Sequence, residues 1–284
     1  MGQIAVICDS TCDMPHELMA AGGVSVVPLK AIFGSEVYQD NIELSAAAFW
    51  EKVRNSPHRP RTSQPAPGEF IQAYEAARAA GADGAVVVLL SSGVSGTYQA
   101  ARIAREALPD FPIELIDTKL ASGGIGMVAL EAAKVARRGA SLAEVAALAR
   151  RRCEQAWLLL VVDSLEWLHR NGRIGRAAAL LGSLFSLRPI LTLAKSDGVI
   201  TPIERTRGRA RALARVGELV REKVPVGSRL HLAVLHGDCE RDGRRLYDEL
   251  AQQYELVDPY FGPVGSVIGS NIGPGAFGVV FYPD

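Results

Sequence analysis

Residues 85–97 read AVVVLLSSGVSGT, an unbroken apolar run followed by small hydroxyl residues and glycine. The run Ala85–Leu90 is typical of a strand that is buried on both faces of a parallel sheet. Ligands of such sheets bind beyond the carboxyl ends of the strands, so the loop Ser91–Thr97 is a candidate binding loop. A second loop, Arg61–Pro67 (RTSQPAP), has similar chemistry. Both offer hydroxyls and N–H groups with almost no formal charge, which suits an anion or an acyl group.

The remainder of the chain alternates apolar runs with helix-like stretches, which predicts an α/β fold. Ser141–Glu144 (SLAE) matches a capping box, and Ser196–Gly198 (SDG) between two apolar runs predicts a hairpin. We expect an N-terminal α/β domain over residues 1–160, with a mostly parallel sheet flanked by helices. A C-terminal α/β domain over residues 161–284 is expected to have a mixed sheet with helices. The expected strands are Ile4–Cys8, Val24–Leu29, Ala85–Leu90, Ile113–Ile116, Trp157–Val162, Pro189–Leu193, Val199–Ile203, Leu230–Leu235 and Phe277–Tyr282, and the expected helices are Ala46–Arg54, Gly68–Ala79, Tyr98–Ala107, Gly123–Ala136, Leu142–Arg152, Arg207–Lys223 and Asp242–Gln252.

Composition narrows the class of protein. The 284 residues carry 31 Lys and Arg against 31 Asp and Glu, and without excess positive charge we expect no nucleic-acid binding. The four cysteines lack the spacing of metal ligands, so we expect reduced thiols and no metal site. The N-terminus has no signal-peptide pattern, which favours a cytoplasmic protein. Residues 259–283 are charge-free and long enough to span a bilayer, but repeated Gly and Pro predict a buried loop, a short helix and a final strand, with no stable membrane insertion.

The same candidate loop leaves alternatives to simple binding open. Gly93–Thr97 (GVSGT) resembles the G-x-S-x-G nucleophile elbow of hydrolases except at its last position. His236 lies downstream and would supply the base, so a serine esterase or lipase that uses Ser95 is one alternative. A sugar- or phosphate-binding regulator without lipid is another. Asp9 and Asp13, after the first strand, suit either turn and cap positions or acid–base and metal chemistry.

A basic cluster follows the middle of the chain. Residues 165–175 (LEWLHRNGRIG) predict a short helix that ends at Asn171-Gly172, with Arg170, Arg173 and Arg176 around its end. Cations are favoured at a helix C-terminus. The cluster therefore suits a solvated helix end, and it suits equally a docking site for a partner or a phosphate.

These landmarks together resemble the DegV family of bacterial lipid-binding proteins, over one unit that spans about residues 3–282. Any one motif is weak, whereas their joint order and spacing are specific. The resemblance implies two α/β domains with a long-chain fatty acid, such as palmitate, stearate or oleate, in a tunnel between them. The motifs that carry it are DSTCD (9–13), TSQPAPGEF (62–70), LSSGVSGTYQ (90–99), Ile116–Gly126, HRNGRIG (169–175), LRPIL (187–191) and GPGAFGVVF (273–281).

What the resemblance implies is a carrier rather than an enzyme. The protein would present its fatty acid to a separate ATP-dependent fatty acid kinase, which forms an acyl phosphate for phospholipid synthesis, and no cofactor is implied. Thr62 and Ser95 are the implied ligands of the carboxylate. Family members often carry His at the position of Asn271, which can donate a hydrogen bond but cannot titrate. The supporting positions are Ser63, Ser92, Gly96 and Asn271, and the implied kinase-docking residues are Arg173 and Arg170.

Overall fold

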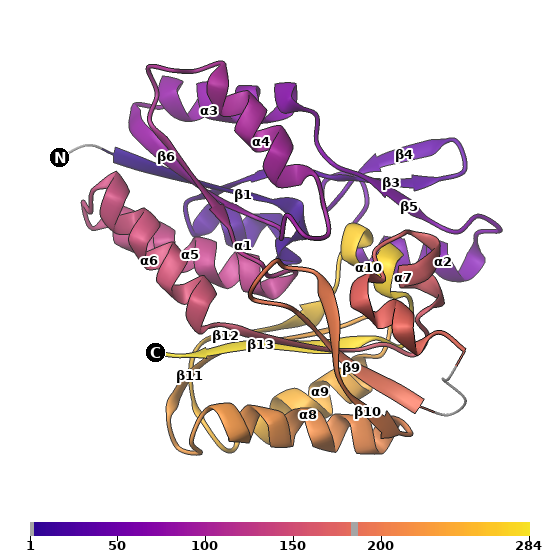
Figure 1. The fold of residues 1–284 in the computed structure, drawn as a ribbon. Helices are drawn as coiled ribbons and strands as arrows, with labels where there is room; N and C mark the ends of the chain where they lie inside the picture. The colour runs from indigo at the N-terminus through magenta and orange to yellow at the C-terminus, as the bar shows by residue number, and fades with distance from the viewer. Residues whose placement is uncertain (1–2, 183–186) are drawn as a thin grey trace.

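The computed structural model describes residues 3–182 and 187–284 and has an α/β fold with three sheets in this part of the chain (Figure 1). The strands are β1 (Gln3–Asp9), β2 (Val24–Val27), β3 (Lys30–Phe33), β4 (Glu36–Gln39), β5 (Arg61–Ser63), β6 (Ala82–Leu89), β7 (Ile113–Asp117), β8 (Trp157–Val161), β9 (Leu187–Leu193), β10 (Ile200–Arg207), β11 (Arg229–His236), β12 (Glu255–Pro263) and β13 (Phe277–Pro283). The helices are α1 (His16–Ala21), α2 (Ala46–Asn55), α3 (Pro67–Ala79), α4 (Thr97–Glu106), α5 (Gly123–Arg137), α6 (Leu142–Gln155), α7 (Glu166–Arg170), α8 (Arg209–Lys223), α9 (Glu240–Ala251) and α10 (Ser266–Ile272), with short 3-10 helices η1 (Ser10–Cys12) and η2 (Gly175–Leu180).

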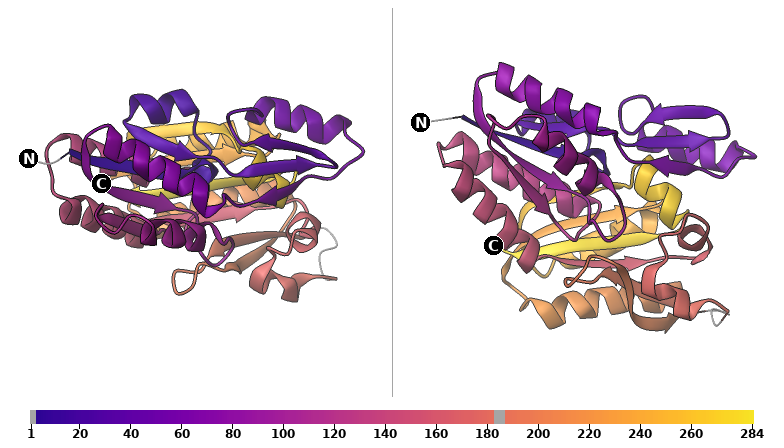
Figure 2. Two further views of the ribbon diagram at one scale, coloured as in Figure 1. Left: turned by 90° about the horizontal axis from the view of Figure 1, so that it is seen from above. Right: turned by 45° about the horizontal axis from the view of Figure 1, so that its top comes forward.

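The first sheet is entirely parallel, with the strand order β2-β1-β6-β7. Strand β6 contains the apolar run of the sequence, and its residues 84–89 are all buried. Helices α3 and α4 cover one face, where Phe70 and Tyr74 are fully buried, and α5 and α6 cover the other (Figures 1 and 2). The prediction of a parallel sheet covered on both faces is confirmed.

The second sheet is mixed, with the order β10-β9-β8-β13-β11-β12. Strands β11 and β12 pair in parallel, whereas the other described pairs are antiparallel. Helices α8 and α9 pack on its outer face, and α5 packs on its inner face, where Gly123 lies against Ala233. The predicted hairpin is confirmed, because β9 and β10 are antiparallel neighbours joined at Ser196–Gly198.

Strand β8 marks where the chain changes from one sheet to the other. The boundary predicted between residues 160 and 161 falls inside β8, and β8 pairs with β13 and β9 of the mixed sheet. The change of sheet therefore occurs before Trp157. An apolar run of five residues suits either sheet, so its pattern alone does not assign it. The division of the chain into two domains stays a prediction.

Besides the short helix α1, the sequence pattern does not predict two features of the fold. One is a small antiparallel sheet, β4-β3-β5, whose strands of three or four residues are too short to show a clear alternation. The other is β12, because Pro259, Gly262 and Pro263 are typical of loops. The segment 259–283 thus begins in a strand rather than in the expected loop, and the short helix and final strand follow as predicted.

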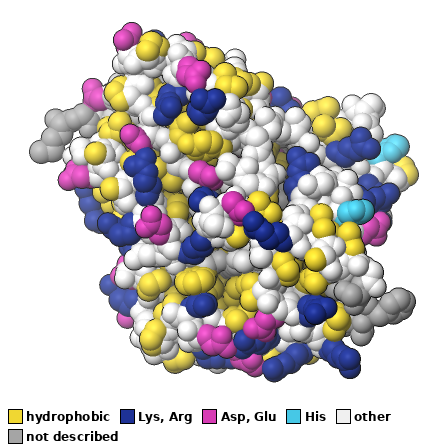
Figure 3. Space-filling model, viewed as in Figure 1, with side chains coloured by type: hydrophobic (Ala, Val, Ile, Leu, Met, Phe, Trp, Pro, Cys, Tyr) yellow, Lys and Arg dark blue, Asp and Glu magenta, His cyan; other side chains and the backbone are white. Residues whose placement is uncertain are grey.

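The surface carries both signs of charge. Figure 3 shows basic, acidic and hydrophobic side chains interspersed on one face of the molecule. All four cysteines are free thiols. In the described ranges, none of the helices combines the length and the apolar character needed to cross a bilayer.

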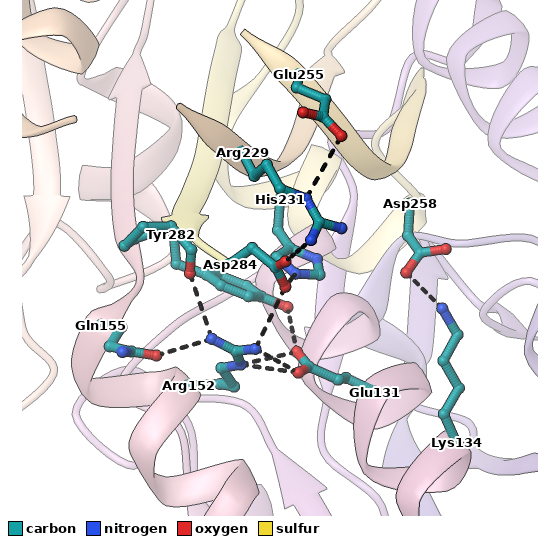
Figure 4. A network of polar contacts seen from close by, with 11 residues as sticks. Glu131, Lys134, Arg152, Gln155, Arg229, His231, Glu255, Asp258, Tyr282 and Asp284 are labelled. Carbon is teal, nitrogen blue, oxygen red and sulfur yellow. Dashed lines mark hydrogen bonds and ion pairs between the residues drawn. The ribbon is translucent and has the colours of Figure 1, made fainter. Parts of the chain in front are cut away.

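A polar network fastens α5 and α6 to the mixed sheet (Figure 4). The Nε of Arg152 donates to both carboxylate oxygens of Glu131, at 2.8 and 3.0 Å. The hydroxyl of Tyr282 donates to the same carboxylate at 3.1 Å, and Arg152 also donates to the carbonyl of Pro283 at 3.3 Å. The side chains of Arg152 and Glu131 are only 12% and 16% exposed, so water screens this ion pair much less than it screens a surface pair.

Replacing Arg152 tests the network. Arg152→Ala would leave Glu131 as an unpaired, mostly buried charge, so we expect the free energy of unfolding in urea to fall by about 3 kcal/mol. The matched control is Arg102→Ala, whose ion pair with Glu106 is 45% and 62% exposed and should contribute less than about 1 kcal/mol. Equal losses in the two variants would contradict the role given to Arg152.

Candidate functional site

An apolar cavity lies between the two large sheets. Its volume is about 120 Å³, roughly ten times the ~10–15 Å³ that one water molecule needs. Leu90 at the end of β6 lines it from the parallel sheet, and Leu235 and Val280 line it from the mixed sheet. Helix α10 contributes Val267 and Ile272. The cavity thus suits an apolar ligand enclosed between the two sheets.

The polar lining of the cavity comes from segments far apart in the sequence. Thr62 and Ser95, the two expected carboxylate ligands, both belong to it, so the structure brings the two candidate loops to one cavity. Arg173 carries the only formal charge among the described lining residues. The polar lining residues are Thr62, Gln64, Ser95, Ser122, Arg173, Thr192 and Asn271.

Strand β5 positions Thr62. Thr62 pairs with Ala31 and Ser63 pairs with Lys30 in the antiparallel sheet. Because successive side chains on a strand point to opposite faces, Thr62 faces the cavity while Ser63 does not line it. The hydroxyl of Ser63 instead donates to the carbonyl of Gln64 at 3.2 Å. The structure therefore separates Ser63 from Thr62, although both stand in one motif.

The loop before α4 positions Ser95. Its Oγ lies 2.8 Å from Oγ1 of Thr97 and accepts from the N–H of Thr97 at 3.2 Å. None of the described residues that line the cavity is a histidine. His236, the candidate base, lies on β11 with its ring 5.4 Å from that of Phe261. Ser95 thus lacks in this cavity the base that a serine hydrolase needs.

Gly96 is where the two loops touch. Its φ of −79° suits any residue, but a Cβ there would overlap the side-chain oxygen of Gln64. A larger residue would displace the end of the Gln64 side chain. Gly96 therefore leaves room for this side chain between the two hydroxyl-bearing loops.

Ser92 has a different partner from Ser95. Its N–H and its hydroxyl donate to the two carboxylate oxygens of Asp117, at 3.0 and 2.6 Å. Asp117 is the last residue of β7. Ser92 thus ties the loop to the neighbouring strand and does not line the cavity.

The turn of the β9–β10 hairpin covers the Ser91–Thr97 loop. The hydroxyl of Ser91 donates to the carbonyl of Gly198 at 2.8 Å, and Lys119 donates to the carbonyl of Ser196 at 2.7 Å. A Cβ on Gly93 would overlap the carbonyl oxygen of Asp197. The mixed sheet therefore reaches across to the parallel sheet at this loop.

The side-chain amide of Asn271 donates one hydrogen bond within α10, while its oxygen accepts none from the described residues. Its Nδ2 donates to the carbonyl of Val267 at 2.8 Å, one turn earlier in α10. Its Oδ1 is buried without a hydrogen-bond partner. Since an amide has two N–H donors, Asn271 retains one N–H and one acceptor for a ligand or a water in the cavity.

Arg173 and Arg170 occupy different surroundings. Arg173 follows α7, donates to the carbonyl of Asn171 at 2.5 Å and lines the cavity. Arg170 is exposed, pairs with Glu166 at 3.3 Å and lines a separate basic depression of about 640 Å³. That depression also contains His58, Arg59 and Arg61.

Two buried carboxylates hold the beginning of α10. Asp13 accepts the N–H of Gly265 at 2.8 Å, and Asp40 accepts the N–H and hydroxyl of Ser266 at 2.9 and 2.6 Å. Burial raises the pKa of both carboxyls. Nothing in the sequence pattern marks Asp40, because its partner lies more than two hundred residues away. These carboxylates fix the helix that carries Asn271.

Asp9 has the cap role that the sequence left open. It accepts the N–H of Thr11 at 3.0 Å and that of Leu90 at 2.7 Å, which joins the ends of β1 and β6. Burial raises its pKa to about 6, against the opposing effect of these hydrogen bonds. In the described ranges, no three His, Cys, Asp or Glu side chains are grouped as metal ligands.

Fold and cavity together define a class of α/β protein in which an apolar ligand cavity, with a largely uncharged polar lining, lies between a parallel and a mixed sheet. The chain belongs to the DegV family. The family model that matches residues 3–284 is described as "Uncharacterised protein, DegV family".

Curated relatives match this chain along its length. Protein DegV of Bacillus subtilis is 33% identical over 277 residues, which cover 97% of this chain and 98% of the relative. A DegV domain-containing protein of Deinococcus radiodurans is 37% identical over 287 residues, which cover 99% and 98%.

Solved structures show the same fold. DegV of Bacillus subtilis, described as a fatty acid binding protein, superposes with a TM-score of 0.92 at 31% identity over 100% of both chains. A DegV family protein of Thermus thermophilus, whose structure is described in terms of fatty acid binding, gives a TM-score of 0.89 at 32% identity over 99% of this chain and 100% of that one.

Asp9 gives a prediction for the pH dependence of the fold. Its pKa of about 6 lies above the ordinary value of 3.8. Between about pH 4 and pH 6, the native protein therefore keeps this carboxyl protonated, whereas the unfolded chain releases the proton. The contribution of Asp9 to stability is therefore complete below about pH 4 and lost as the pH rises through 6. A carbon-13 NMR titration should place the midpoint of this carboxyl near pH 6.

The matching variant is Asp9→Asn, which cannot titrate. It should remove from the unfolding free energy a pH-dependent part of about 2–3 kcal/mol. A midpoint for Asp9 near its ordinary value, or an unchanged pH profile in the variant, would contradict the prediction.

Proposed function

We propose that this chain binds one long-chain fatty acid, of the palmitate, stearate or oleate class, in the cavity and acts as a cytoplasmic carrier. The observation that carries this proposal is the apolar cavity between the sheets, which has Thr62, Ser95 and Asn271 in its lining. The description of the similar Bacillus subtilis protein as fatty acid binding supports it. The carrier presents the carboxylate to a separate ATP-dependent fatty acid kinase, whose acyl phosphate product enters phospholipid synthesis.

The acyl tail supplies the affinity. Burying ~15 methylenes at ~0.8 kcal/mol each contributes on the order of 10 kcal/mol, of which association and ordering costs offset a large part. The head group therefore needs only a few hydrogen bonds to fix its position. This division of work fits a cavity lined mainly by aliphatic side chains.

Uncharged ligands suit a carboxylate that must react. Hydrogen bonds from Thr62, Ser95 and the remaining N–H of Asn271 hold the carboxylate without enclosing both oxygens. A bidentate guanidinium would occupy both. One oxygen thus stays available to attack the phosphoryl group on the kinase. Arg173, at the same cavity, neutralises the charge from one side.

The carrier proposal has an advantage over the esterase alternative. A serine esterase needs a base beside Ser95, and the described lining of the cavity contains no histidine. Ser95 instead shares its hydrogen bonds with Thr97. We therefore assign Ser95 to holding the carboxylate and leave the chemistry to the kinase.

The head-group assignment is tested by matched serine variants. Denaturing extraction and mass spectrometry of the purified protein should release stoichiometric fatty acid. Ser95→Ala or Thr62→Val should weaken binding roughly ten- to a hundredfold, as expected for one lost hydrogen bond to a charged group. Ser92→Ala, whose hydroxyl binds Asp117 instead, should leave the affinity nearly unchanged.

Two outcomes would reject the assignment. If the protein retains no fatty acid, even after incubation with oleate or palmitate, the carrier proposal fails. Turnover of a chromogenic ester that disappears in Ser95→Ala would instead establish the esterase alternative.

We also propose that the kinase docks at the exposed end of α7 and the turn that follows it. Arg170 and Arg173 lie there, and the depression beside Arg170 adds His58, Arg59 and Arg61. This concentration of positive charge fits an acidic surface on the kinase.

Kinase assays on palmitate-loaded protein distinguish the role of Arg170 from that of Arg173. Arg170→Ala should retain palmitate yet reduce acyl phosphate formation by the cognate kinase several-fold, more strongly at low salt. Arg173→Ala should reduce acyl phosphate formation and also loosen palmitate, since Arg173 lines the cavity. Arg78→Ala, on the exposed end of α3, is the control. Loss of palmitate in Arg170→Ala would contradict its docking role.

A further inference from the structure

The ligand cavity has a neighbour on its far side. A second cavity of about 630 Å³ shares part of its wall with the first. Leu158 and Leu159 of β8 and Thr192 and Leu193 of β9 line both cavities. Thr62 and Ser95 do not line the second cavity. The shared wall is therefore away from the residues assigned to the carboxylate.

The shared wall is a gap in the mixed sheet. Among the described residues, β8 and β9 pair only through Leu160 with Leu191 and Val161 with Ile190. Residues 157–159 of β8 still pair with β13 on their other side, and residues 192–193 of β9 pair with β10. The two strands thus separate where the two cavities meet.

Residues of both faces of the sheet border this gap. Leu158 and Leu193 belong to the core between the sheets, whereas Leu159 belongs to the core under α8 and α9. Side chains of adjacent strand residues point to opposite faces. A wall shared by Leu158 and Leu159 therefore describes a passage through the sheet rather than a groove along one face.

The strands separate next to the point where the hairpin contacts the parallel sheet. The turn of the β9–β10 hairpin is bonded to the parallel sheet through Ser91 and Lys119. Beyond the paired residues, the end of β9 leads into this turn, while β8 stays paired with β13. The gap therefore lies beside the contact that covers the Ser91–Thr97 loop.

The second cavity has aromatic and aliphatic residues in its lining together with charged ones. The charged residues are Asp117, Lys119, Arg150, Glu154, Lys195 and Lys223. Trp157 and Phe281, paired across β8 and β13, belong to its lining. Lys195 and Lys223 place their Nζ atoms 4.7 and 4.4 Å from the centre of the Trp157 ring. Such cation–π contacts hold an indole ring in place at a solvent boundary. Trp157, 36% exposed, thus forms a fixed wall between the cavity and water.

We propose that the methyl end of the fatty acid passes between β8 and β9 and ends in the second cavity against Trp157. The inference rests on the proposed function and adds where the tail ends. It makes the gap, rather than a closed cavity wall, the feature that admits chains too long for the first cavity.

An open far end has a measurable consequence. Each methylene that leaves water adds ~0.8 kcal/mol, a factor of about four in affinity. Affinity for saturated acids should therefore keep rising or level off from hexadecanoic to docosanoic acid. A closed cavity would instead reject the longer acids.

Tryptophan fluorescence reports the position of the tail directly, because a bromine atom quenches an indole ring that it touches. Octadecanoic acid brominated at its terminal carbon should quench the wild-type protein, and Trp157→Phe should lose most of this quenching. The same acid brominated at mid-chain is the control and should quench Trp157 much less.

Narrowing the gap is the second test. Thr192→Phe should lower the affinity ratio of docosanoic to hexadecanoic acid by at least about tenfold, the loss of two or more buried methylenes. Thr201→Phe is the matched control, since Thr201 pairs with Thr192 in register but lines neither cavity. Circular dichroism checks that both variants fold.

The outcomes separate this inference from the proposed function. If both brominated acids bind and the terminal bromine quenches wild type and Trp157→Phe alike, the passage is rejected while fatty acid binding stands. Equal affinity ratios in Thr192→Phe and wild type would reject it as well. If no fatty acid binds at all, the proposed function fails and this inference with it.

Discussion

The cavity depends on one contact, in which the turn of the β9–β10 hairpin lies directly on the Ser91–Thr97 loop. A Cβ on Gly93 would overlap the carbonyl oxygen of Asp197, and a Cβ on Gly198, whose φ is +71°, would overlap the hydroxyl of Ser91. Neither position therefore has room for a side chain. The contact covers the loop that carries Ser95 and joins the two sheets. It lies beside the place where β9 separates from β8.

Arg173 carries the one formal charge in the described lining of the cavity, and buried acidic residues are placed around it. Asp9, Asp13 and Asp40 are buried and bind backbone N–H groups at the ends of strands and at the start of α10. Their cost of burial raises the pKa of each. They hold the elements that present Ser95 and Asn271 without themselves lining the cavity. A rigid, hydrogen-bonded frame around a largely uncharged site suits a protein that must bind a carboxylate and leave it reactive.

Much of the fold and part of the site follow from local patterns. The hairpin at Ser196–Gly198 and the capping box at Ser141 are confirmed, because each depends on residues that are neighbours in the sequence. The parallel sheet is confirmed as well, because the apolar run of each strand is a local signal although the strands pair over long separations. Motif order pointed to Thr62 and Ser95, and the structure places both at one cavity. Ser63 and Ser92 lie in the same motifs but turn to other partners, since strand alternation and a carboxylate on β7 decide their directions.

The periodicity of apolar residues and the turn residues between them determine the α/β class and the position of the binding loops, because these signals act over a few residues. Other features do not follow from local signals. These are the sheet to which β8 belongs, the buried position of Asp40, and the gap lined by Leu158 and Leu193. They arise when the mixed sheet packs against the parallel sheet and its hairpin reaches the Ser91–Thr97 loop. Contacts between residues separated by scores of positions leave no local pattern, so only the packed molecule specifies them.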